Sequence, residues 1–223
     1  MTLATFKDLC LDAVDVELVG RFWAAALGRP LHRRDDGIAR IDHDILHTLW
    51  INPVPEPKLV KNRVHLDVHA PSAQLLIDLG ATPGVAQEMF QVVFDPAGDE
   101  LCVFPDDGPP IARPFALCVD AGSPVPIAAW WAGVLGAELA PGPDGALRYL
   151  HGSAGMDGLI MKFVPVDDAR QVKNRCHWDV AVDDVETLVD RGATVLRRPD
   201  DGIRWTILAD PDGNEFCAFE PGP

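Results

Sequence analysis

The stretch KNRVHLDV, residues 61–68, occurs a second time as KNRCHWDV at residues 173–180. Six of the eight positions are identical. In an extended strand, residues two apart point to the same side, so His65 and Asp67 share one face of their strand. The chain is therefore predicted to present an imidazole and a carboxylate side by side.

The segments around this motif also repeat, and in the same order. LCLDA at residues 9–13 is matched by LCVDA at residues 117–121. A chain of 223 residues can hold two domains of ordinary size. The repeat therefore predicts two domains, residues 1–108 and residues 113–223, joined by a linker rich in Pro, Asp and Gly.

Each half is predicted to contain two modules, and each module consists of a strand, a helix and three strands. Apolar residues at helical spacing follow the first strand, with Asp15 as the expected N-cap and Gly28 as the expected C-cap. In the second half, Ser123 is expected to cap the corresponding helix. Asp183 and Glu186 have the spacing of a capping box for the helix after it.

Four such strand-helix-strand units are each too small to bury a core alone. We expect an α+β fold in which four βαβββ modules pair and form two cup-shaped sheets, with the helices outside. The sequence leaves open whether each cup forms within a half or across the halves. Clefts of this kind are where small ligands usually bind.

Composition excludes several classes of partner. The formal net charge of -15 repels phosphate backbones and anionic membrane surfaces, so neither nucleic acid nor a membrane is an expected partner. The N-terminal residues do not resemble a signal peptide, which favours a cytoplasmic protein. Either a monomer or a homodimer is expected. The five cysteines show no CxxC spacing and are expected to be free thiols.

Taken together, these elements resemble the glyoxalase, bleomycin-resistance and extradiol dioxygenase group, the vicinal oxygen chelate superfamily. The resemblance covers essentially the whole chain. It is carried by the strand-helix opening, the His-bearing strand at the middle of each half, and the closing Asp-Pro-x-Gly hairpin. It implies two glyoxalase-like cups that hold a divalent metal through His, Glu and Gln side chains.

The family's four ligand positions can be carried over onto each half. In the N-terminal half the positions fall on Asp8, His47, His65 and Cys102, and in the C-terminal half on Ala116, Leu159, His177 and Cys217. The N-terminal set implies a site for Fe, Mn, Ni, Co or Zn. No metal is expected in the C-terminal half, because alanine and leucine cannot ligate.

Further residues are candidates for catalysis or substrate binding. Glu100 shares a strand face with Cys102, so it is a candidate general base, together with Asp67. The competing interpretation is a salt bridge from Glu100 to Arg63. A second set of residues is predicted to line a substrate pocket, although core packing is an alternative for each tryptophan: Trp50, Trp178, Trp205, His177 and Glu215.

Two functions remain open from the sequence. The first is a metal-dependent lyase, isomerase or dioxygenase in which the metal polarises vicinal oxygens of a small substrate. The second is metal-free sequestration of a small molecule or antibiotic, as in bleomycin-resistance proteins. The bare positions Ala116 and Leu159 favour the second.

Overall fold

The computed structural model describes residues 2–221, which form two eight-stranded mixed sheets and four helices. Sheet A contains, in order, β14 (Thr194–Arg197), β15 (Thr206–Ala209), β16 (Glu215–Phe219), β13 (Cys176–Val182), β1 (Ala4–Ala13), β4 (His47–Pro53), β3 (Ala39–His43) and β2 (His32–Arg33). Sheet B contains β10 (Glu138–Pro141), β11 (Leu147–His151), β12 (Ile160–Pro165), β9 (Arg113–Ala121), β5 (Val64–Ala70), β8 (Glu100–Pro105), β7 (Gln91–Phe94) and β6 (Thr82–Ala86). The helices are α1 (Val16–Leu27), α2 (Ala73–Asp78), α3 (Pro124–Leu135) and α4 (Glu186–Val189).

Four consecutive βαβββ modules build these sheets, which confirms the predicted α+β class. Modules 1, 2, 3 and 4 begin with β1, β5, β9 and β13 respectively. Sheet A joins modules 1 and 4 through antiparallel pairing of β1 with β13, and sheet B joins modules 2 and 3 through β5 and β9. Each sheet therefore draws one module from each half, so the division into domains 1–108 and 113–223 stays a prediction.

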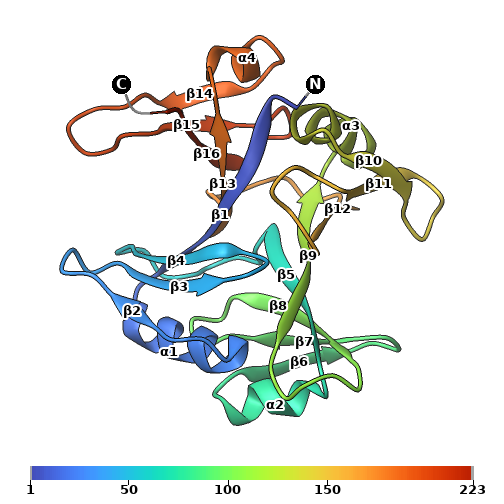
Figure 1. The fold of residues 1–223 in the computed structure, drawn as a ribbon. Coiled ribbons are helices and arrows are strands. Elements are labelled where there is room, and N and C mark those ends of the chain that lie inside the picture. Colours follow the sequence, from blue (N-terminus) through green and yellow to red (C-terminus); the bar gives the residue numbers. More distant parts are fainter. Residues whose placement is uncertain (1, 222–223) are drawn as a thin grey trace.

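Figure 1 shows how the two halves are stacked. Most of the N-terminal half lies in the lower part of the view and most of the C-terminal half in the upper part, while β1 and β9 cross between them. Helices α2 and α4 lie at the bottom and top of the view, whereas α3 packs between the sheets, in contact with β1 of sheet A and with β11 and β12 of sheet B. Within the described residues, every helix is too short or too polar to cross a membrane.

The two larger helices begin and end for identifiable reasons. The Asp15 side chain accepts a hydrogen bond from the Leu18 N–H at 2.9 Å, and Gly28 adopts a left-handed conformation at the end of α1, so both predicted caps are confirmed. Ser123 is the N-cap residue of α3, as predicted, but it does not cap the helix with its side chain. Asp212 accepts the Ser123 N–H at 3.0 Å instead.

The predicted capping box of α4 is wrong. This helix spans only Glu186–Val189, and its N-cap is Val185, which has no side chain able to accept a hydrogen bond. The Glu186 N–H donates to Asp184 rather than to Asp183, at 2.9 Å. A neighbouring acid thus takes the role expected from the sequence spacing.

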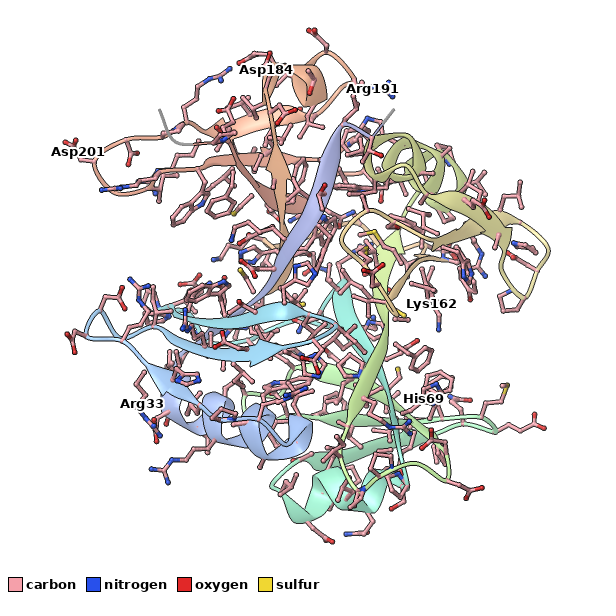
Figure 2. The ribbon with its side chains drawn as sticks, in the orientation of Figure 1. Arg33, His69, Lys162, Asp184, Arg191 and Asp201 are labelled. Atoms are coloured by element: carbon pink, nitrogen blue, oxygen red, sulfur yellow. The ribbon has the colours of Figure 1, made fainter. Side chains whose placement is uncertain are left out.

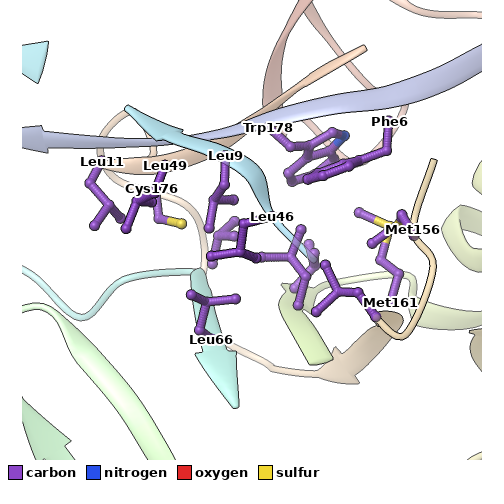
Figure 3. Close-up of a cluster of buried hydrophobic side chains, with 14 of the residues drawn as sticks. Phe6, Leu9, Leu11, Leu46, Leu49, Leu66, Met156, Met161, Cys176 and Trp178 are labelled. Atoms are coloured by element: carbon purple, nitrogen blue, oxygen red, sulfur yellow. The ribbon is translucent and has the colours of Figure 1, made fainter. Parts of the chain in front are cut away.

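One continuous core lies between the two sheets. It includes Leu9 of β1, Leu66 of β5, Met161 of β12 and Trp178 of β13 (Figure 3). Alternation along each strand sends these apolar residues to the core and the intervening residues to the opposite face. We call the opposite faces cup A, which carries Cys10, His177 and Asp179, and cup B, which carries His65, Asp67 and Cys118.

The closing hairpin of the N-terminal half is tied to α1 by a buried carboxylate. Asp95 accepts hydrogen bonds from the Ala97 and Asp99 N–H groups, and also from the Trp23 indole at 3.1 Å. The Asp95 side chain is buried, and this burial raises the pKa of its carboxyl group to about 6. The hairpin predicted from the Asp-Pro-x-Gly sequence is confirmed by the Gly98 N–H bond to the Asp95 carbonyl.

This raised pKa predicts a loss of stability as the pH rises. Because the folded pKa lies above the unfolded value, the folded state holds its proton longer, so the free energy of unfolding falls between about pH 4 and pH 6. The two pKa values imply a fall of roughly 3 kcal/mol from Asp95. Urea unfolding of the wild type and Asp95→Asn across this range measures it. A wild-type-minus-variant difference that does not change with pH would contradict the assignment.

Gly155 is required where the loop before β12 touches β1. Its φ is +78°, and a Cβ built there would overlap the carbonyl oxygen of Phe6. Gly155→Ala should therefore lower the free energy of unfolding by at least about 3 kcal/mol. Gly152, in the same loop, has φ +65° and open space around its Cβ position, so Gly152→Ala is the control and should cost about 1 kcal/mol. Equal costs would contradict this reading of the contact.

Candidate functional site

The four predicted N-terminal metal ligands do not converge. Asp8 and His47 lie on strands of sheet A, whereas His65 and Cys102 lie on strands of sheet B. The grouping expected from the sequence assumed a cup within one half. Because the sheets form across the halves, that grouping is wrong.

Asp8 and His47 each make other contacts. The Asp8 carboxylate pairs with Lys7 and accepts the Thr48 N–H at 3.1 Å. His47 is exposed, has a positive φ of 55°, and packs its ring against the core residue Phe6 at 5.7 Å.

The motif residues instead form two equivalent trios. In cup A, Cys10, His177 and Asp179 offer ligand atoms that all lie within 4.8 Å of one another. The corresponding trio of cup B has the same residue types in the same relation: His65, Asp67 and Cys118. Burial lowers the pKa of both histidines, so each imidazole is neutral.

In cup B the carboxylate is paired with a lysine. Asp67 accepts a hydrogen bond from the Lys162 ammonium at 2.8 Å and from the Cys118 thiol at 3.1 Å. Its other oxygen lies 3.7 Å from His65. Burial opposes the Lys162 charge, but the ion pair with Asp67 raises the pKa of Lys162 overall.

Aromatic rings enclose the Lys162 ammonium. The nitrogen lies 4.6 Å from the ring centre of Phe115, 5.4 Å from that of Phe104 and 5.7 Å from that of Tyr149. These are cation–π distances. His69 stacks on Phe115 at 4.1 Å, and Figure 2 shows Lys162 and His69 on the same side of the molecule. Cup B thus holds an ammonium group supplied by its own chain.

Cup A has no cation at the corresponding register position. At the register position of Lys162, which pairs with Cys118, sheet A carries Trp50, which pairs with Cys10. Asp179 is only 4 % exposed, and its Oδ1 atom has no hydrogen-bond partner within the described residues. Its Oδ2 atom receives the Cys10 thiol at 3.6 Å. Burial raises the pKa of Asp179 to about 7.

A cavity of about 360 Å³ lies over this carboxyl group. Its aromatic wall contains Trp50, together with Trp205 and Phe219, which stack at 5.2 Å. Its charged wall contains Lys7, Arg34 and Asp36. This volume and this mixture of apolar walls with a few polar groups are typical of small-molecule sites.

The remaining predicted residues are placed differently. Trp178 belongs to the core, where it is 1 % exposed and packs on Trp131 at 5.1 Å, so it does not line the cavity. Glu100 pairs with Lys58 at 2.7 Å, not with Arg63, and accepts the N–H of Asn62 in the first motif copy at 3.1 Å.

Glu215 repeats this arrangement in the second copy. It pairs with Arg170 and accepts the Asn174 N–H at 3.1 Å. The Lys-Asn-Arg part of each copy thus lies in a separate cleft of about 280 Å³, lined by residues 56–63 and 168–175. Both glutamates order the motif loops there rather than facing the cavity of cup A.

Comparisons with known proteins agree with this fold. The model of the family described as "Glyoxalase-like domain" matches residues 8–104 and again residues 116–219. The chain belongs to this glyoxalase-like family. No curated protein sequence is similar to the chain.

Solved structures of other glyoxalase-like proteins share its fold. A glyoxalase I mutant from Zea mays is 14% identical, with a TM-score of 0.68 over 97% of this chain and 94% of that chain. A putative dioxygenase from Bacillus subtilis is 13% identical, with a TM-score of 0.67 over 99% and 87%. The predicted resemblance to the vicinal oxygen chelate superfamily is confirmed at the level of the fold.

The sequence analysis missed the residues that distinguish the two cups. Asp179 is part of the motif, but the sequence does not reveal that its Oδ1 atom lacks a hydrogen-bond partner among the described residues. Lys162 stands in an otherwise apolar strand, Ile160–Pro165, which is a signal that a charge is directed inward. The matched cysteines Cys10 and Cys118 were a second signal, since both prove to touch a motif carboxylate.

Proposed function

We propose that this glyoxalase-like protein binds a small organic molecule in cup A, while sheet B serves as the structural counterpart. The observation that carries the proposal is the cavity of about 360 Å³ above the Asp179 carboxyl group, whose Oδ1 atom has no hydrogen-bond partner among the described residues. A buried polar atom without a partner costs free energy, and a ligand that supplies a donor would remove this cost.

The side chains that line the cavity would contact different parts of the ligand. Trp50, Trp205 and Phe219 offer apolar faces for a flat or aliphatic ligand body. His177 and Asp179 lie at the floor and offer polar contacts that fix the orientation of the ligand. This proposal corresponds to the sequestration function that the sequence left open.

The proposal is tested with matched variants in the two cups. Small aromatic amines, alcohols and acids are added to the protein, and the ligand-induced shift in melting temperature is measured. Phe219→Ala should abolish the shift, whereas Phe104→Ala, at the corresponding position of cup B, should retain it. If no compound shifts the melting temperature, or if Phe219→Ala leaves the shift unchanged, cup A is not the binding site.

A second candidate is a metal-dependent enzyme. The thiol of Cys10, the imidazole of His177 and the carboxylate of Asp179 are all ligand types found in zinc sites, and the orphaned Asp179 oxygen fits such a role. A bound metal would act there as a Lewis acid that polarises substrate oxygens. The protein's own contribution would be to orient the substrate between the aromatic wall and the cup floor.

Metal analysis separates the two candidates. Untagged protein is analysed for Fe, Mn, Co, Ni and Zn, alongside Asp179→Asn and Asp67→Asn/Lys162→Met as variants of the two cups. If cup A is a metal-dependent active site, the wild-type protein should contain about one ion per chain, and only Asp179→Asn should lose it. A content far below one ion, not restored by adding these metals, would exclude it.

A further inference from the structure

In cup B, the side chain of Lys162 occupies the place that a ligand would take. The Lys162 ammonium sits on the Asp67 carboxylate at 2.8 Å, with the Phe115 ring centre 4.6 Å away. This is the arrangement by which proteins bind an organic ammonium ion: a buried carboxylate supplies the charge and aromatic faces supply the walls.

Cup A has the same elements without the ammonium. Asp179 corresponds to Asp67 in the repeated motif, and Phe219 corresponds to Phe104. Trp50 stands where the other cup has Lys162, so no side chain at this register position can reach the carboxylate as a cation. Trp50 and Asp179 both line the cavity of about 360 Å³.

The carboxyl groups around the cavity outnumber its cations, since Lys7 and Arg34 face Asp8, Asp36 and Asp179. Lys7 pairs with Asp8, and its charge also opposes the burial that raises the pKa of Asp179, while Arg34 pairs with Asp36 at 2.9 Å. The Lys7 ammonium also lies 4.5 Å from the ring centre of Phe219, so this wall already accepts a cation at its rim. The remaining titratable neighbours, His177, Cys10 and Cys217, carry no positive charge that would oppose a second cation.

We propose that the ligand of cup A is a primary organic amine, whose ammonium group binds Asp179 and whose apolar body packs on Trp50, Trp205 and Phe219. This inference rests on the proposed small-molecule site and names its ligand class. Lys162 is then an intramolecular analogue of that ligand, which keeps cup B filled.

Three probes of similar shape test the ligand class: benzylamine, benzyl alcohol and benzoate. Their affinities are measured by calorimetry at about pH 8, where benzylamine remains cationic. Benzylamine should bind at least about tenfold more tightly than the other two, since a charge-assisted hydrogen bond replaces a neutral one. Asp179→Asn should remove this preference, while the double variant Asp67→Asn/Lys162→Met, altered only in cup B, should keep it.

A variant of cup B tests the proposal independently. Removal of the internal ammonium by Lys162→Ala should create a second amine site, so propylamine should raise the melting temperature of Lys162→Ala more than that of the wild type. Propanol should not. Equal effects of propylamine on both proteins would overturn the idea that cup B is an ammonium site.

The experiments distinguish a failure of the amine proposal from a failure of the small-molecule site. If benzyl alcohol or benzoate binds in a manner sensitive to Phe219→Ala and benzylamine binds no better, the amine class is wrong while the small-molecule site stands. If none of the three probes binds, and the wider set of compounds also fails, both are wrong.

Discussion

Lys162→Met is expected to lower the free energy of unfolding by about 3–5 kcal/mol, because it leaves the buried Asp67 carboxylate without its cation. The Lys162 side chain is 13% exposed and that of Asp67 is 5% exposed, so water does not replace the lost partner. The Cys118 thiol and His65 remain nearby, but neither supplies a full positive charge. Urea unfolding measures the loss.

A second substitution distinguishes lost pairing from lost packing. Asp67→Asn in the Lys162→Met background removes the unpaired charge, so the double variant should recover most of the lost stability. Methionine retains much of the length and apolar volume of lysine, which keeps the contacts with Phe104 and Phe115. A double variant no more stable than Lys162→Met would show that the ion pair is not the source of the effect.

Trp178→Ala should cost about 3–5 kcal/mol, which is the range for deleting a large buried aromatic side chain. Trp178 lies in the core between the sheets, close to Phe6 (Figure 3). It contacts Trp131 and lies near Phe216. Its removal leaves a cavity that the two paired sheets cannot close without shifting. Thermal and urea unfolding both measure the cost.

Trp205→Ala is the matched control for Trp178→Ala. Trp205 is partly exposed at the wall of cup A and stacks only on Phe219 among the aromatic residues described. Its loss should change stability by less than about 1 kcal/mol but should weaken ligand binding in cup A. Similar losses of stability in both variants would contradict the separation of core and cavity tryptophans.

Much of the local structure could be predicted from particular residues. The Asp15 and Gly28 caps define α1, and the Asp95 turn defines the closing hairpin, because each depends on hydrogen bonds within a few residues. Ser123 is the N-cap residue of α3, as predicted, but its side chain makes no capping bond, and Asp212 from a distant turn accepts the Ser123 N–H. At α4 the prediction of Asp183 was wrong, because Asp184 accepts the Glu186 N–H.

The site was less predictable because it depends on which strands become neighbours. The two first-strand segments, LCLDA at residues 9–13 and LCVDA at residues 117–121, are nearly identical, as are the two motif copies. Local sequence therefore does not specify which copy pairs with which. Contacts distant in sequence accompany the observed pairing, such as the Phe6 N–H bond to the Ala154 carbonyl at 2.9 Å.

The sequence by itself determined the four modules, their class and the presence of an imidazole beside a carboxylate on each motif strand, since these follow from periodicity and repetition. Only the tertiary structure decided that the sheets cross between the halves. It also decided that Lys162 fills one cup while Trp50 leaves the other open above Asp179. The physical reason is that an ion pair across neighbouring strands depends on register and strand order, which a single strand's sequence does not encode.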